Sequence, residues 1–233
     1  MGTNPVIARV APHFGEEPCI SGANGSGTIF FSGCTLGCVY CQNYEISSLH
    51  RGREITPQEL ADCYKRLEEQ NVHNINLVTA DHFAPAVVKS FEIYKPKIPI
   101  VYNCSGYTSP KILNMLDGIV DIYLPDFKYS NNELALKYSL APNYVETATV
   151  AIKEMLFQVG FPQFDDRQIC LLYTSPSPFF RHTQRTVWKF LIFSRKTMAI
   201  RFLSASWGSI SPWATLINMK RLTVKLQGGN IRK

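Results

Sequence analysis

The amino-acid sequence predicts an α/β fold built on a parallel sheet, and two observations support this prediction. Between residues 74 and 160, short apolar runs of strand length alternate with segments of helical pattern. Strands separated by helices of roughly ten residues are typical of β/α units, whose strands pair in parallel. An apolar content of 45% in 233 residues is also sufficient for a hydrophobic core. The pattern leaves undecided whether the sheet is open or closed into a barrel.

The first predicted elements lie on either side of a cysteine-rich loop. Residues 27–31, GTIFF, form a short apolar run after a glycine-rich turn and predict a buried strand. Thr56 is the expected N-cap of a helix ending near Gln70, because Pro57 and Glu59 follow it at the positions that such a cap favours. The sequence then predicts strand 74–80, helix 84–94, strand 98–107, helix 109–116, strand 120–129 and helices 131–139 and 143–160.

Polar segments accompany the ends of all four predicted strands. The loop CTLGCVYC follows the first strand and TADHF the second, while NCSGY ends the third and PDFK the fourth. In folds made of β/α units the loops after parallel strands converge on one face. We therefore expect one functional site at these strand ends.

Cys34, Cys38 and Cys41 have two structural interpretations. Their spacing of four and three residues would place them on one face of a helix, as a buried cysteine stripe. Gly33 and Gly37 disfavour a helix, since each costs about 1 kcal/mol relative to alanine. A loop that surrounds a metal centre is therefore the preferred interpretation.

Thiolate ligands suit zinc or an iron–sulfur cluster. Structural zinc normally has four protein ligands, and no second CxxC pair exists, although Cys19, Cys63, Cys104 or a histidine could supply the fourth. A [4Fe–4S] cluster held by three cysteines instead keeps one iron open for another ligand. Seven cysteines, no signal-peptide pattern and no apolar run of 18 residues predict a reducing, cytoplasmic location.

The charge distribution divides the chain. Residues 1–166 hold all 18 Asp and Glu but 12 of the 24 Lys and Arg, and residues 167–233 hold the other 12 with all three tryptophans. Such a tail could be an arm for nucleic acid or a membrane surface. We favour another interpretation, because residues 170–178, CLLYTSPSP, resemble a translated sequencing adapter. We expect a core of residues 1–165, an aberrant frameshifted tail of residues 166–233, and no nucleic-acid or membrane partner.

CTLGCVYC resembles the signature of the radical SAM superfamily, in which an aromatic residue precedes the last cysteine. Residues 8–165, with APHFGEEP, VYNCSGY and YLPDFKY, are similar to pyruvate formate-lyase activating enzymes and their relatives. The resemblance implies a partial (β/α) barrel that is incomplete at the C-terminus, and a core that is truncated at the N-terminus.

The resemblance also implies a ligand set. Cys34, Cys38 and Cys41 would bind a [4Fe–4S] cluster whose fourth iron binds S-adenosyl-L-methionine (SAM). The other implied contacts are Tyr40 at the adenine, Thr79 at the methionine amino group, Asn103 near the ribose and carboxylate, and Asp126 and Lys128 at a monovalent cation and the carboxylate. Residues 103 and 104 depart from the acidic-plus-threonine pair of the activating enzymes, which weakens the cation assignment.

The implied activity is reductive cleavage of SAM to methionine and a 5′-deoxyadenosyl radical that abstracts hydrogen, with activation of a glycyl-radical enzyme as its purpose. The implied partners are an external electron donor of flavodoxin or ferredoxin type and a protein substrate with a target glycine. The alternative is a non-enzymatic iron–sulfur or zinc-binding protein. A frameshift that scrambles the last strands would leave the chain as written inactive.

Some other polar residues are interpreted from residue type and position. Glu16 and Glu17 are expected to be a solvated pair, and His82 to have either a site or a surface role. Cys63 is expected to pack within the helix that follows Thr56. Cys104 ends a predicted strand within the expected site, so we expect it to be more reactive than Cys63.

Overall fold

The computed structural model describes residues 4–160, 163–164, 170–172, 189–194 and 197–204. The chain divides into two compact units, residues 1–182 and 183–233. In the second unit, β9 (Lys189–Ser194) and β10 (Thr197–Ser204) form an antiparallel pair. The predicted boundary after residue 165 and most of the predicted tail lie outside the described residues, so the frameshift stays a prediction.

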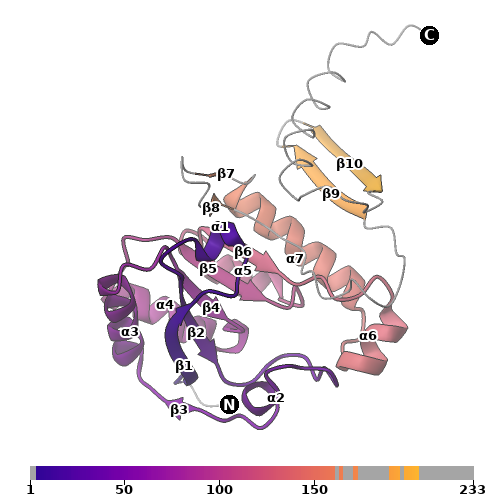
Figure 1. The fold of residues 1–233 in the computed structure, drawn as a ribbon. Helices are drawn as coiled ribbons and strands as arrows, with labels where there is room; N and C mark the ends of the chain where they lie inside the picture. Colours follow the sequence, from indigo (N-terminus) through magenta and orange to yellow (C-terminus); the bar gives the residue numbers. More distant parts are fainter. Residues whose placement is uncertain (1–3, 161–162, 165–169, 173–188, 195–196, 205–233) are drawn as a thin grey trace, which may run out of the picture. The chain divides into compact units, whose positions relative to one another are not determined.

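The first unit is built on a six-stranded mixed sheet in the order β3-β1-β2-β4-β5-β6, which is open within the described residues (Figure 1). The pairings of β2, β4, β5 and β6 are parallel, as predicted, whereas β1, which was not predicted, pairs antiparallel with β2 and β3. The strands are β1 (Val6–His13), β2 (Ser26–Phe31), β3 (Arg53–Glu54), β4 (Ile75–Val78), β5 (Ile100–Cys104), β6 (Ile122–Pro125) and a separate antiparallel pair, β7 (Gln163–Phe164) with β8 (Cys170–Leu172).

Helices alternate with the parallel strands along the chain. α3 (Pro57–Glu69) begins after Thr56, whose side chain accepts the Glu59 N–H at 3.2 Å while the Glu59 carboxylate accepts the Thr56 N–H at 2.8 Å. This capping box confirms the predicted N-cap. The other helices are α1 (Pro18–Ser21), α2 (Tyr44–Ser47), the 3₁₀ turn η1 (Asp81–Phe83), α4 (Ala84–Ile93), α5 (Pro110–Leu116), α6 (Asn132–Ser139) and α7 (Tyr144–Val159). No helix in the described part of the chain has the length and apolar character needed to cross a bilayer.

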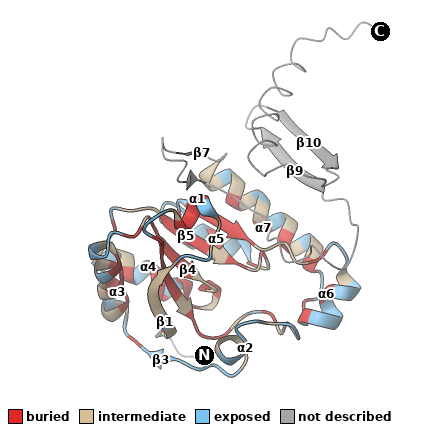
Figure 2. Cartoon of the chain, in the orientation of Figure 1, coloured by how far each residue is buried: buried red, intermediate tan, exposed pale blue. Residues whose placement is uncertain are grey.

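The two faces of the sheet differ in polarity. The register of β4 with β5 pairs Leu77 with Tyr102 and Val78 with Asn103, so residues of one pair share a face. Leu77 and Tyr102 are fully buried in an apolar core with side chains from α3, α4, α5 and α7. Figure 2 colours most of β5 as buried. Asn103 lies on the opposite face, and so does Asn76, two residues before Val78. The sheet therefore keeps polar side chains on the face turned away from that core.

Hydrogen bonds from a buried asparagine connect α1 to the amino ends of the parallel strands. Asn74 is 1% exposed, its Nδ2 donates to the Ile20 carbonyl at 2.7 Å, and its Oδ1 accepts from the Ser26 hydroxyl at 2.6 Å. Gly27 has no room for a side chain, because a Cβ there would lie 3.0 Å from the Asn74 carbonyl oxygen. This anchor fixes the segment that carries Glu16 against the sheet.

Replacing Asn74 with alanine should lower the free energy of unfolding by about 2–4 kcal/mol, because the buried Ser26 hydroxyl and Ile20 carbonyl lose their partners. Urea unfolding followed by circular dichroism measures this loss. The control is Asn114→Ala at an exposed position of α5, which should change the free energy by less than about 0.5 kcal/mol. Equally small effects of the two substitutions would contradict the anchoring role.

Candidate functional site

The cysteine loop connects β2 to α2, and hydrogen bonds to the segment that follows it hold its start. The Gly33 N–H donates to the Ile46 carbonyl at 3.0 Å, and the Ser32 hydroxyl donates to the Arg51 carbonyl at 2.9 Å. Gly33 has a φ of +89°, a conformation that glycine adopts without steric cost. Residues 33–43 form no helix or strand. The predicted loop is therefore confirmed over the helical cysteine stripe.

Two of the three cysteine sulfurs have hydrogen-bond partners close to the loop. The Leu36 N–H donates to Cys34 Sγ at 3.4 Å, and Cys41 Sγ lies 3.2 Å from the Ser47 hydroxyl of α2. Burial raises the pKa of the Cys34 thiol to about 11, although the Leu36 N–H opposes the shift. A positively charged metal centre would favour the thiolate form that binds it.

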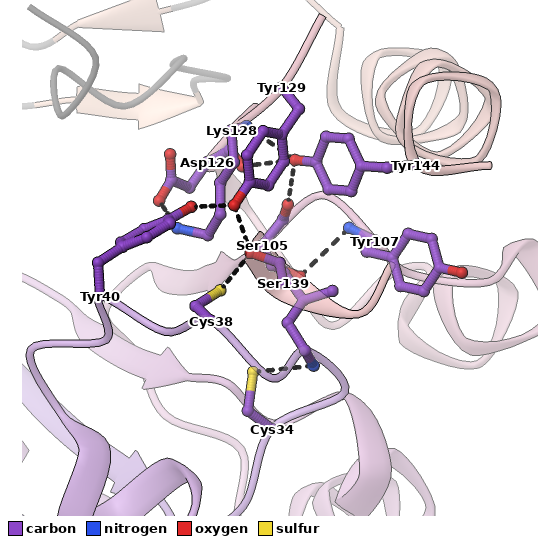
Figure 3. Close-up of polar contacts among 11 residues, drawn as sticks. Cys34, Cys38, Tyr40, Ser105, Tyr107, Asp126, Lys128, Tyr129, Ser139 and Tyr144 are labelled. Carbon is purple, nitrogen blue, oxygen red and sulfur yellow. Dashed lines mark hydrogen bonds and ion pairs between the residues drawn. The ribbon is translucent and has the colours of Figure 1, made fainter. Parts of the chain in front are cut away.

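The third sulfur is contacted by a helix from a distant part of the chain. The Gly37 N–H donates to the Ser139 carbonyl at 2.9 Å. The Val39 N–H donates to the Tyr138 carbonyl at the same distance. The Ser139 hydroxyl then donates to Cys38 Sγ at 2.9 Å (Figure 3). The C-terminal end of α6 thus holds both the backbone and a sulfur of the loop.

A chain of hydroxyl groups extends from Cys38 to Tyr40 (Figure 3). The Tyr129 hydroxyl lies 2.5 Å from Ser139 Oγ and 2.6 Å from the Tyr40 hydroxyl. Ser139 and Tyr129 are buried, whereas the Tyr40 ring is 38% exposed. Burial, together with the hydrogen bond to Tyr129, raises the pKa of Tyr40. Tyr40, which was predicted to contact the adenine, therefore lies within the cysteine loop with its side chain partly open to solvent.

Asp126 and Lys128 follow β6 and form an ion pair (Figure 3). The Tyr144 hydroxyl accepts the Lys128 N–H at 2.8 Å and donates toward the Asp126 carbonyl at 2.9 Å. Burial opposes the charge of Lys128, but Asp126 more than offsets it and raises the pKa of the ammonium; the nearby Cys38 and Cys34 act in the same direction. Lys128 is therefore a fixed positive charge near the cysteine loop.

Thr79 is the first residue after β4 and has a φ of +60°. A β-branched side chain rarely adopts this conformation, which costs about 1–3 kcal/mol. Its N–H donates to the Asn103 carbonyl at 2.9 Å, so Thr79 and Asn103 lie at neighbouring strand ends, as predicted. Strained backbone of this kind concentrates at functional sites.

Glu16 is the residue that the sequence interpretation missed. Its Oε1 accepts hydrogen bonds from Asn76 Nδ2 at 3.2 Å and from Asn103 Nδ2 at 3.3 Å. Burial, with a smaller effect of Glu17, raises the pKa of Glu16. The expectation of a solvated pair is therefore wrong for Glu16, which reaches the polar face of the sheet.

The remaining sequence interpretations have mixed outcomes. Cys104 is buried in the core on the helix-covered face, and burial raises its pKa, so the expectation of a reactive site cysteine is wrong. Cys63 packs in the same core, as predicted. His82 Nε2 lies 2.8 Å from the Ser32 carbonyl oxygen, which requires the proton on that nitrogen. His82 thereby supports the start of the cysteine loop.

The donor set suits an iron–sulfur cluster, because thiolates are the usual ligands of such clusters. Among the described residues, no group of three His, Cys, Asp or Glu side chains is placed to hold a single metal ion. Cys34, Cys38 and Cys41 are free, half-buried and each in hydrogen-bond contact at sulfur, which is the environment that iron–sulfur ligands have.

The cysteine loop follows the carboxyl end of β2, the first strand of the parallel part of the sheet, where loops of β/α folds gather functional residues. The Radical SAM superfamily model matches residues 28–167, and the chain belongs to this superfamily. Membership implies a [4Fe–4S] cluster and SAM.

The chain is also 34% identical over 144 residues to an uncharacterized protein of Methanocaldococcus jannaschii. The match covers 58% of this chain and 41% of that protein, so the chain spans about two fifths of the length of this curated relative.

Removing the Ser139 hydroxyl should lower the reduction potential of the reconstituted cluster. A hydrogen bond to a ligand sulfur stabilises the more negative, reduced cluster, so Ser139→Ala makes reduction harder. Potentiometric titration followed by electron paramagnetic resonance measures the shift. Ser130→Ala, the same substitution at an exposed serine before α6, should leave the potential unchanged. Equal potentials in the two variants would show that Ser139 only packs α6.

Proposed function

We propose that this chain is a radical SAM enzyme in which Cys34, Cys38 and Cys41 hold three irons of a [4Fe–4S] cluster, and SAM is reductively cleaved for hydrogen abstraction. The observation that carries the proposal is the cysteine loop itself. Three half-buried thiols follow one parallel strand, and each sulfur has a hydrogen-bond partner, which is Leu36 within the loop for Cys34, Ser47 of α2 for Cys41 and Ser139 of α6 for Cys38.

The remaining predicted contacts are assigned roles from their chemistry. When bound, the reduced cluster and SAM supply the electron transfer that releases methionine and a 5′-deoxyadenosyl radical. Lys128 would bind the methionine carboxylate, because its ammonium is charged and lies near the loop. Asp126 would orient that ammonium, and Thr79 would present polar groups to the methionine amino group from its strained position. Tyr40 would lie beside the adenine, and Asn103 near the ribose and the methionine carboxylate.

An aromatic cluster supports the exclusion of water from this site. Tyr107 stacks on Tyr144 with ring centroids 5.8 Å apart, and Phe127 and Tyr129 contact the same ring at 5.8 and 5.4 Å. Cys38, like Cys34, packs against the buried part of this cluster. Apolar walls of this kind protect a reactive intermediate from side reactions.

The surface beside the loop supports an external electron donor of flavodoxin or ferredoxin type as partner. Val39, directly after Cys38, is 73% exposed, and Leu140 at the end of α6 is 69% exposed. Exposed apolar side chains beside the cluster ligands suit transient docking of a redox protein. The resemblance to pyruvate formate-lyase activating enzymes supports a narrower proposal, in which the hydrogen donor is a glycine of a partner protein.

The first test removes one cluster ligand. Cys34→Ala should reduce the iron content after anaerobic reconstitution from about four to at most three per chain and abolish 5′-deoxyadenosine formation from SAM with dithionite, because the cluster loses a thiolate ligand. Cys63→Ala, at the core cysteine, should keep both properties. If wild-type protein binds a cluster but releases no 5′-deoxyadenosine, the alternative of a non-enzymatic iron–sulfur protein is favoured.

The second test uses the strained threonine. Thr79→Gly should raise the free energy of unfolding by about 1 kcal/mol, since glycine adopts a positive φ without steric cost, and should weaken SAM binding. Equilibrium dialysis with labelled SAM and urea unfolding measure the two effects. Asn71→Gly, at an exposed position with a φ of +57°, should leave SAM binding unchanged. A Thr79→Gly protein that binds SAM as well as wild type would remove Thr79 from the cofactor site.

A further inference from the structure

A carboxylate and two amides from three separate segments meet on the polar face of the sheet. Glu16 comes from the segment before α1, Asn76 from β4 and Asn103 from β5. Both amide Nδ2 groups donate to the same oxygen, Glu16 Oε1, at 3.2 and 3.3 Å. Because a carboxylate only accepts, each amide must turn its NH₂ group toward Glu16 and its carbonyl oxygen elsewhere.

In this orientation the side-chain carbonyl oxygen of Asn76 accepts no hydrogen bond from the described residues. Asn76 is fully buried, and its Oδ1 has no hydrogen-bond partner in the described structure. An unsatisfied buried acceptor destabilises the folded state, and such groups are rare in native proteins without a functional reason. A ligand that donates a hydrogen bond would remove this destabilisation.

The negative charge at Glu16 also lacks a counter-ion. None of the ion pairs in the described part of the chain includes Glu16, and Glu17 beside it adds repulsion. The two amide donors stabilise the carboxylate only in part, because burial still raises its pKa. A positively charged ligand would compensate the charge in a way that a neutral donor cannot.

Asn76 lies deeper in the sheet than the contacts proposed for the cofactor, whereas Asn103 belongs both to those contacts and to the group around Glu16. Asn76 stands two residues before Val78, the last residue of β4, so it lies about 7 Å deeper along the strand than the strand end. The cysteine loop and Thr79 follow strand ends. Asn103 contacts residues at both depths, since its backbone carbonyl accepts from Thr79 at the strand end and its side chain donates to Glu16.

We propose that Glu16, Asn76 and Asn103 form a substrate subsite that binds a primary ammonium group. A primary ammonium has three donors, enough for the Glu16 carboxylate and the Asn76 carbonyl, and its charge matches the carboxylate. The subsite rests on the proposed function, because it places an amine-bearing substrate next to the site at which the radical is formed.

The test titrates 1-butylammonium into the reconstituted protein without reductant and follows saturation-transfer NMR. We expect binding to wild type and an affinity about tenfold or more lower in Glu16→Gln, because the charged hydrogen bond is lost. Glu17→Gln removes the same charge one residue away and should bind as wild type does. Iron content and circular dichroism check that the variants are folded.

Two measurements on wild-type protein make the result independent of any variant. Butyrate, which carries a negative charge, and butyltrimethylammonium, which has no N–H donor, should both fail to bind. Binding of either probe as strong as that of 1-butylammonium, or an equal loss in Glu16→Gln and Glu17→Gln, overturns the subsite. Displacement of 1-butylammonium by SAM would show that the subsite binds the amino group of the cofactor, and would overturn the substrate role. Because no reductant is present, these outcomes do not depend on whether the protein cleaves SAM.

Discussion

The cysteine loop has no regular secondary structure, so its shape depends on hydrogen bonds from segments on both sides of it. Backbone carbonyls of residues after the loop hold its start, and carbonyls at the end of α6 hold its middle. Ser139 adds a direct hydrogen bond to the sulfur of Cys38. A loop fixed in this way can present three thiols in one arrangement, which a cluster needs before it can bind.

The two faces of the sheet have different roles. One face is apolar and packs against the helices, so it contributes stability through burial. The other face carries Asn76 and Asn103, and Glu16 reaches it from the segment that Asn74 anchors. Polar residues are tolerated there because hydrogen bonds connect them, and the Oδ1 of Asn76, unpaired among the described residues, is the acceptor on which the proposed ammonium subsite rests. The residues that stabilise the fold therefore lie on one face of the sheet, and the polar residues of the candidate site lie on the other.

Much of this arrangement was readable from the sequence because its signals are local. The capping box at Thr56, the four parallel strands and the polar residues at their ends all follow from spacing within one element or turn. Cys104 was wrongly predicted to lie in the site, although the alternation of side chains along a strand predicts otherwise. Adjacent residues of a strand face opposite sides, so Cys104 faces the apolar core when Asn103 faces the polar side. A stricter use of the two-residue period would have separated these neighbours.

Other parts could not be read in this way because they depend on contacts between distant residues. Ser139 lies 101 positions after Cys38, and no pattern near either residue indicates their contact. β1 was not predicted because its strand conformation depends on antiparallel pairing with β2, a tertiary contact that the local sequence does not specify. Glu16 resembled a surface residue because a second glutamate and a proline follow it, and its partners lie 60 and 87 positions away.

The central claim is that three cysteines leave one iron of the cluster open to SAM. Electron–nuclear double resonance of the reduced wild-type protein with SAM labelled with ¹⁵N in the amino group and ¹⁷O in the carboxylate tests it most directly. We expect hyperfine couplings from both nuclei, which require direct coordination to an iron. A reduced cluster without these couplings at saturating SAM would contradict the claim.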